Sequence, residues 1–185
     1  MSGQTFGLTR RRLLGGLAAG AAACALPAPA IARRAGRFRA LTLNNLHTGE
    51  WLSTAYWIDG DYLPEAMDAI SYILRDWRAE AVKPIAPETM DILAAMHRKL
   101  ETEEPLQIIS GYRTPETNAM LRSRSRGVAR KSYHMKAMAV DLSMESRDVR
   151  QLARAAESLG AGGVGRYSRS EFIHVDSGPV RTWGR

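Results

Sequence analysis

The stretch Ser132-Tyr-His-Met-Lys-Ala-Met-Ala-Val-Asp141 brings a histidine and an aspartate to the start of an apolar run. Its second half predicts a buried strand over residues 137–143. Val140 and Leu142 flank Asp141, so their side chains should point to the opposite face of that strand. The carboxylate of Asp141 is then held beside a core, which is costly unless it is paired or binds a metal. This stretch therefore predicts a strand with a polar site at its edge.

A second polar cluster lies further along the chain, in Glu171-Phe-Ile-His-Val-Asp176. A strand there would carry His174 and Asp176 on one face, because side chains alternate along a strand. If this strand lies beside the one that holds Asp141, then His134, Asp141 and His174 form a three-ligand site with an open fourth position. An open position distinguishes hydrolytic zinc sites from structural ones. Taken alone, a histidine on a strand is more often a hydrogen-bonded structural residue than a metal ligand.

The pattern of elements around these clusters predicts an α+β fold, with a small antiparallel sheet and helices packed on one side. Helices come mostly first and strands mostly last, which is typical of that class. We expect the fourth helix to be capped by Ser146 and ended by Gly160. The helices are predicted over residues 63–80, 87–100, 114–121 and 146–159, and the strands over 39–46, 53–58, 106–110, 137–143, 163–167 and 172–176.

Residues 1–32 have the pattern of a twin-arginine-type signal peptide. Arginines 10–12 precede a run of Ala, Gly and Leu that ends at Ala30-Ile-Ala32. A permanent membrane anchor is disfavoured by Pro27 and Pro29. Lipid attachment at Cys24 is an alternative, although alanine rather than leucine stands three residues before it. We therefore expect export to the periplasm, with residues 33–185 forming a single domain.

Charge and cysteine content narrow the possible partners. Removing the three arginines of the signal lowers the formal net charge from +7 to +4. This modest charge, together with the signal, argues against nucleic acid and suits an acidic polymer such as the cell wall. The single cysteine lies in the signal, so the remaining chain is expected to have neither a disulfide nor a cysteine metal site.

Three motifs together resemble the M15-type zinc D-Ala-D-Ala metallopeptidases. They are Ser110-Gly-Tyr-Arg-Thr114, Ser132-x-His-x-x-x-x-Ala-x-Asp141, and the late strand that holds His174. Gly163-Val-Gly-Arg-Tyr167, the run from Glu171 to Trp183, and Leu46-His-Thr-Gly-Glu50 resemble the murein endopeptidase K-like branch of that superfamily. The resemblance covers nearly all of the chain after the signal.

The resemblance implies a role for each matching residue. His134, Asp141 and His174 would bind zinc, and Arg113 would hold a substrate carboxylate or a polarised carbonyl. Glu171 would be the general base. It can reach the metal only from a bend, because residues three apart on a strand project to opposite faces. Asp176 is the alternative base, or a partner that orients His174.

The function that follows is zinc-dependent hydrolysis of peptidoglycan cross-links by a murein endopeptidase that acts as a monomer. A carboxypeptidase on stem peptides and a non-catalytic wall-binding module are the alternatives, and D,D and L,D bonds both stay open. No membrane span is expected once the signal is removed. The basic loop over residues 122–131 either forms one wall of the groove or is solvated surface. Related sequences often have glycine at Ala137, which matters only if the backbone there needs positive φ.

Overall fold

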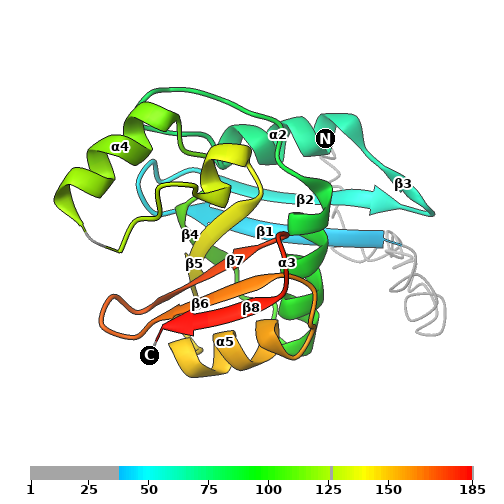
Figure 1. Cartoon of the computed structure of the whole chain (residues 1–185). Helices are drawn as coiled ribbons and strands as arrows, with labels where there is room; N and C mark the ends of the chain where they lie inside the picture. Colours follow the sequence, from blue (N-terminus) through cyan, green and yellow to red (C-terminus); the bar gives the residue numbers. More distant parts are fainter. Residues whose placement is uncertain (1–37, 126, 185) are drawn as a thin grey trace, which may run out of the picture.

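The computed structural model describes residues 38–125 and 127–184, so the expected signal lies outside the described part. Within these two stretches the strands form one sheet, in the order β3-β2-β1-β4-β5-β7-β6-β8 (Figure 1). Neighbouring strands are antiparallel except for the pairs β1–β4 and β6–β8. The strands are β1 (Phe38–Asn45), β2 (Trp51–Ile58), β3 (Asp61–Tyr62), β4 (Leu106–Ser110), β5 (Ala139–Ser143), β6 (Gly163–Tyr167), β7 (Phe172–Asp176) and β8 (Arg181–Gly184).

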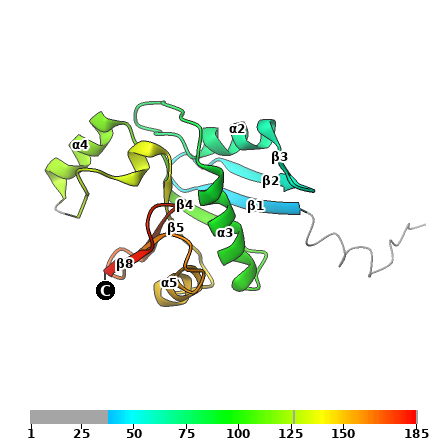
Figure 2. The ribbon, with the colours of Figure 1, turned by 45° about the vertical axis from the view of Figure 1, so that its right-hand side comes forward.

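Helices in the described stretches pack mainly on one face of this sheet. They are α2 (Pro64–Ile73), α3 (Pro87–Lys99), α4 (Pro115–Arg124) and α5 (Val149–Glu157), with a short 3-10 helix η1 (Tyr133–Lys136). α3 packs on β1 and β7, and α5 packs on β6 and β7. α4 lies apart from α2, α3 and α5 in both views (Figure 2). No helix in the described stretches is long and apolar enough to cross a membrane.

The core lies between the sheet and these helices. Leu43 pairs with Leu106, and Ile108 pairs with Leu142, which in turn pairs with Ile173. All five side chains are buried in one apolar cluster. The α+β class, the mainly antiparallel sheet and the placing of helices on one side are thus confirmed.

Three predicted helices have different boundaries in the structure. α4 continues to Arg124, into the stretch predicted as a loop. α2 ends at Ile73 rather than at residue 80, because Asp76 accepts a hydrogen bond from the backbone N–H of Arg78 and forms a local turn instead. α5 is capped by Asp148, in a capping box with Gln151, and not by Ser146. The backbone N–H of Ser146 donates to the carboxylate of Glu104, so this residue belongs to the preceding loop.

The register of the strands brings the candidate site residues Asp141 and His174 together. Asp141 on β5 lies directly opposite His174 on β7, and the same row continues through Gly165 on β6 to Trp183 on β8. Val140 on β5 is in the buried core, as its alternation with Asp141 predicted. The face away from α3 and α5 therefore carries the polar row. Sequence analysis did not predict the short strands β3 and β8.

Gly111, which follows β4, offers a test of how tightly this part of the fold is packed. A Cβ at this position would lie 2.3 Å from the carbonyl oxygen of Leu74 and 2.8 Å from its Cβ. We expect Gly111→Ala to lower the free energy of unfolding by roughly 1–3 kcal/mol, because the Leu74 backbone must move to admit the methyl group. Chemical denaturation followed by circular dichroism measures this change.

Gly127→Ala is the matched control. Gly127 is exposed, and its added Cβ would meet nothing closer than 3.6 Å, so the expected change is within about 0.5 kcal/mol. Superimposable unfolding curves for Gly111→Ala and the wild type would show that the packing at Leu74 is loose.

Candidate metal centre

Three side chains from separate elements converge on one point. His134 comes from η1, Asp141 from β5 and His174 from β7, and all three are buried. His134 Nε2 lies 3.1 Å from Asp141 Oδ1, and His174 Nδ1 lies 2.8 Å from the same oxygen. The two imidazole nitrogens are 3.1 Å apart. Among the described residues, this trio is the group of His, Cys, Asp and Glu side chains whose ligand atoms lie close enough to share a metal ion.

Hydrogen bonds on the far side of each ring determine which nitrogen faces the other ligands. His134 Nδ1 lies 2.6 Å from the carbonyl oxygen of Gly111, which can only accept, so this nitrogen carries the proton. His174 Nε2 lies 2.8 Å from Asp176 Oδ2 in the same way. The nitrogens that remain, Nε2 of His134 and Nδ1 of His174, present lone pairs towards Asp141. Partners of this kind are typical of metal-binding histidines.

The distances between the three ligand atoms fit a zinc ion. Tetrahedral zinc with bonds of about 2.0–2.1 Å separates its nitrogen and oxygen ligands by roughly 3.3 Å. The observed separations of 2.8, 3.1 and 3.1 Å are close to that value. Two lone pairs and a carboxylate oxygen packed together repel one another, and a bound cation removes that repulsion.

The protonation states of Asp141 and His134 agree with metal binding, whereas His174 has a proton that a metal must displace. Burial alone would raise the pKa of Asp141, but His134 and His174 beside it hold the pKa of that carboxyl well below its ordinary value. Burial lowers the pKa of His134. Burial would also lower the pKa of His174, but its hydrogen bonds to Asp141 and Asp176 outweigh this and raise it. An ionised carboxylate and a neutral imidazole are the forms that bind metals.

The loop that carries His134 is held by local bonds. Ser132 Oγ accepts the backbone N–H of His134, and the N–H of Ala137 donates to the carbonyl of His134. Ala137 is buried and has φ of 54°, the left-handed region that favours glycine. The backbone at this alanine therefore does need positive φ. The loop maintains its conformation despite the cost of a Cβ there.

Asp176 lies behind His174 and has no free acceptor towards the metal ligands. Arg181 Nη1 donates to its Oδ1 at 2.9 Å, and Arg181 Nη2 donates to its Oδ2 at 2.7 Å. The backbone N–H of Gly178 adds a third bond at 2.9 Å. Burial would raise the pKa of Asp176, but His174 and Arg181 hold it well below its ordinary value. This geometry suits a residue that orients His174, one of the two roles expected for Asp176.

Arg113 is buried beside the trio with most of its hydrogen-bonding capacity unused. Within the described residues, its guanidinium makes one polar contact, from Nη2 to Asp141 Oδ2 at 3.5 Å. Its Nε is buried without a partner. Burial lowers the pKa of Arg113, since the charge has lost its water. A buried guanidinium with free donors is ready to bind an oxygen of an incoming molecule.

The trio and Arg113 line a pocket of about 560 Å³. The loop after α4 forms one wall through Ser125, Val128 and Lys131, among others, which confirms that the basic loop borders the groove. Tyr167, Phe172, Arg181 and Trp183 also line this pocket. Among its described residues, Asp141 is the only carboxylate.

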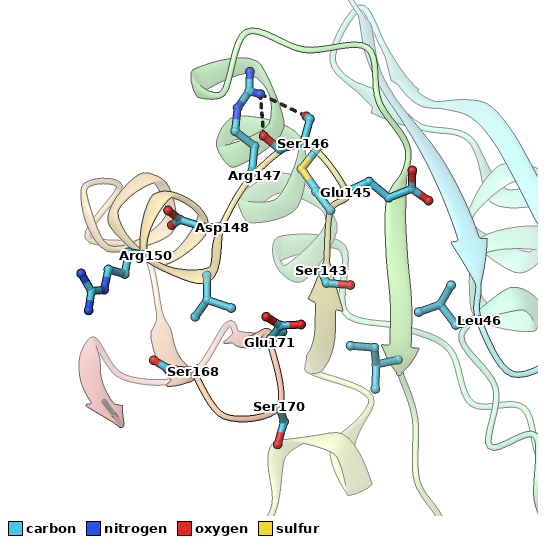
Figure 3. Close-up of a pocket in the computed structure, with 13 residues that line it drawn as sticks. Leu46, Ser143, Glu145, Ser146, Arg147, Asp148, Arg150, Ser168, Ser170 and Glu171 are labelled. Atoms are coloured by element: carbon cyan, nitrogen blue, oxygen red, sulfur yellow. Dashed lines mark hydrogen bonds between the residues drawn. The ribbon is translucent and has the colours of Figure 1, made fainter.

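Glu171 lies outside this metal pocket. It sits at a bend directly before β7, with φ of 53°, as a reach towards the metal would require. Its exposed side chain nevertheless lines a neighbouring pocket of about 820 Å³, together with Ser143 and Asp148 (Figure 3). Ser170 lines both pockets, so they adjoin there. The structure does not bring Glu171 to the three ligands, and its expected role as general base gains no support from this geometry.

Sequence reasoning missed two contributors to the centre. The carbonyl of Gly111 holds His134, and Arg181 holds Asp176. The signal for Arg181 was its place shortly after the strand, in Asp176-Ser-Gly-Pro-Val-Arg181, where a tight turn can return a cation to the carboxylate. A backbone carbonyl leaves no such signal, because every residue has one.

Comparisons with known proteins identify the family of this chain. The peptidase M15 family described as peptidoglycan L,D-endopeptidase MepK matches residues 33–183. The peptidoglycan L,D-endopeptidase MepK of Escherichia coli (strain K12) is 46% identical over 181 residues, which cover 96% of this chain and 98% of that protein. A Haemophilus influenzae protein named probable peptidoglycan L,D-endopeptidase MepK is 40% identical over 146 residues, 78% of each chain. Because the family match covers most of its length, this chain belongs to the MepK family of M15 peptidases.

Proposed function

We propose that this chain is a zinc-dependent endopeptidase that hydrolyses L,D peptide cross-links in peptidoglycan. The convergence of His134, Asp141 and His174 beside an open pocket carries the proposal. Two imidazoles and one carboxylate are the donor set of several catalytic zinc sites. The proposed substrate and bond type come from the names of the relatives, which are peptidoglycan L,D-endopeptidases.

Each residue of the site has a proposed part in the reaction. A zinc ion bound by the trio would supply a Lewis acid and a water molecule of lowered pKa. Arg113 donates hydrogen bonds to the oxygen of the scissile amide, where negative charge develops in the transition state. Asp176 keeps His174 in the orientation that the metal needs. Glu171 contacts the peptide beyond the scissile bond, in the neighbouring pocket.

The two adjoining pockets favour an endopeptidase over a carboxypeptidase. A carboxypeptidase needs a groove that closes shortly after the scissile bond. Here Ser170 borders both pockets, and Asp141 in one and Ser143 in the other lie on the same face of β5. This continuity supports a groove that accepts peptide on both sides of the bond.

Export is part of the same proposal. Peptidoglycan lies outside the cytoplasm, and residues 1–32 have the pattern of a twin-arginine-type signal. We propose that residues 33–185 act in the periplasm as a single domain and as a monomer.

Metal and bond specificity can be tested together on purified protein. We expect one zinc per chain, and cleavage of muropeptide dimers with L,D cross-links but not of those with D,D cross-links, read by mass spectrometry. A chelator should abolish cleavage, and added zinc should restore it. Asp141→Asn should reduce both zinc content and cleavage, because it removes the charged ligand. Binding to peptidoglycan without cleavage, in zinc-loaded protein, would instead favour the wall-binding module.

Arg113→Met tests the role of the free guanidinium. We expect kcat/KM to fall by about 10²–10³-fold with zinc still bound, as for loss of a donor to a developing oxyanion. Arg154→Met on the exposed surface of α5 is the control and should keep wild-type kinetics. Wild-type kcat/KM in zinc-loaded Arg113→Met would exclude this role.

Glu171→Gln distinguishes substrate contact from proton transfer. If Glu171 only contacts the substrate outside the metal pocket, the substitution should raise KM several-fold and leave kcat within about threefold. The reason is that the lost interaction is the same in the ground state and in the transition state. A fall in kcat of more than about a hundredfold with zinc retained would instead identify Glu171 as the general base.

A further inference from the structure

Arg181 on β8 makes more contacts around the metal centre than its surface position suggests. It donates two parallel hydrogen bonds to Asp176, at 2.9 and 2.7 Å. Its guanidinium also lies against two aromatic rings, 5.0 Å from the centre of Tyr133 and 4.8 Å from that of Trp183. Trp183 in turn lies 5.2 Å from the His174 ring. Arg181 is therefore fixed by ion pairing on one edge and by aromatic rings near its faces.

Two glycines on β6 leave the space that this arrangement fills. Gly163 pairs with Arg181 and Gly165 pairs with Trp183 across β6 and β8. A Cβ at Gly163 would lie 2.3 Å from Arg181 Nη1 and 2.6 Å from Asp176 Oδ2. A Cβ at Gly165 would lie 2.5 Å from the Trp183 ring. The glycines in Gly163-Val-Gly165 thus let both β8 side chains lie across β6 towards His174.

We propose that Arg181 is a positioning residue that determines, through Asp176, which ring nitrogen of His174 faces the metal. The proposal rests on the proposed zinc site. Arg181 binds both oxygens of Asp176, so the carboxylate is held in one orientation, with Oδ2 at 2.8 Å from His174 Nε2. That bond retains the proton on Nε2 and leaves Nδ1 free to bind. Without Arg181, the N–H of Gly178 still holds Oδ1, but Oδ2 loses the donor that fixes it opposite the imidazole.

Zinc affinity is the first readout. We expect Arg181→Met to raise the zinc dissociation constant by about 10–100-fold, the range found when such outer partners of metal ligands are removed. Arg181→Lys retains the charge but cannot bind both carboxylate oxygens, so its affinity should lie between those of Arg181→Met and the wild type. Arg154→Met, on the exposed surface of α5, is the control and should bind zinc within twofold of the wild type. Competition with a chromophoric chelator measures all four proteins.

The tautomer of His174 is the second readout and needs no metal. In the metal-free wild type, at a pH high enough for His174 to be neutral, nitrogen-15 NMR should find its proton on Nε2, and in Arg181→Met a mixture of the two tautomers. A residue that only stabilises the fold would change the unfolding temperature and leave this ratio unchanged. Circular dichroism checks that each variant is folded.

The outcomes separate this inference from the proposed function. A folded Arg181→Met that binds zinc within twofold of the wild type and retains the Nε2 tautomer overturns the inference. If Arg181→Met does not fold, Arg181→Lys decides by the same criteria. If the wild type binds no zinc, the proposed function fails, and an unchanged tautomer ratio in Arg181→Met then overturns the inference as well.

Discussion

The pairing of β5 with β7 brings Asp141 directly opposite His174, and the rest of the site depends on this register. A shift of one residue in either strand would turn one of the two side chains into the apolar core. The core residues on the other face, Leu142 opposite Ile173 among them, resist such a shift because they would then face the site. The same contacts that stabilise the domain therefore hold two of the three candidate ligands at contact distance.

The charges around His134, Asp141 and His174 favour the binding of a cation. Asp141 is ionised, both histidines present lone pairs to it, and Arg113 lies against its outer oxygen at 3.5 Å with free donors. In the proposed function, a metal ion would balance the first group, and an oxygen of the substrate would accept from the free donors of Arg113. The trio suited to a metal and the free donors of Arg113 suited to a substrate oxygen thus lie a few ångströms apart in a single pocket.

The fold class and the row that contains Asp141 and His174 were predictable because they follow from the alternation of apolar and polar side chains along the strands. Val140, Asp141 and Leu142 determine which face of β5 is buried, and this could be read from three consecutive residues. The end of α2, the cap of α5 and the strand β8 were not predicted. At the start of α5, for example, Ser146 and Asp148 are both good capping residues, and the long-range bond from Ser146 to Glu104 leaves the cap to Asp148. The side-chain direction of Glu171 was also out of reach, because it depends on the conformation of the hairpin between β6 and β7. Only the bend was foreseeable, and the bend alone does not say which pocket the carboxylate enters.

X-ray absorption at the zinc edge of the zinc-loaded protein tests the central claim most directly. The account predicts a four-coordinate shell of nitrogen and oxygen at about 2.0–2.1 Å, with the scattering pattern of two imidazoles and no sulfur. The pattern should drop to one imidazole in His174→Ala. A shell without imidazole, or one unchanged in His174→Ala, would contradict the assignment of His134, Asp141 and His174 as the metal ligands.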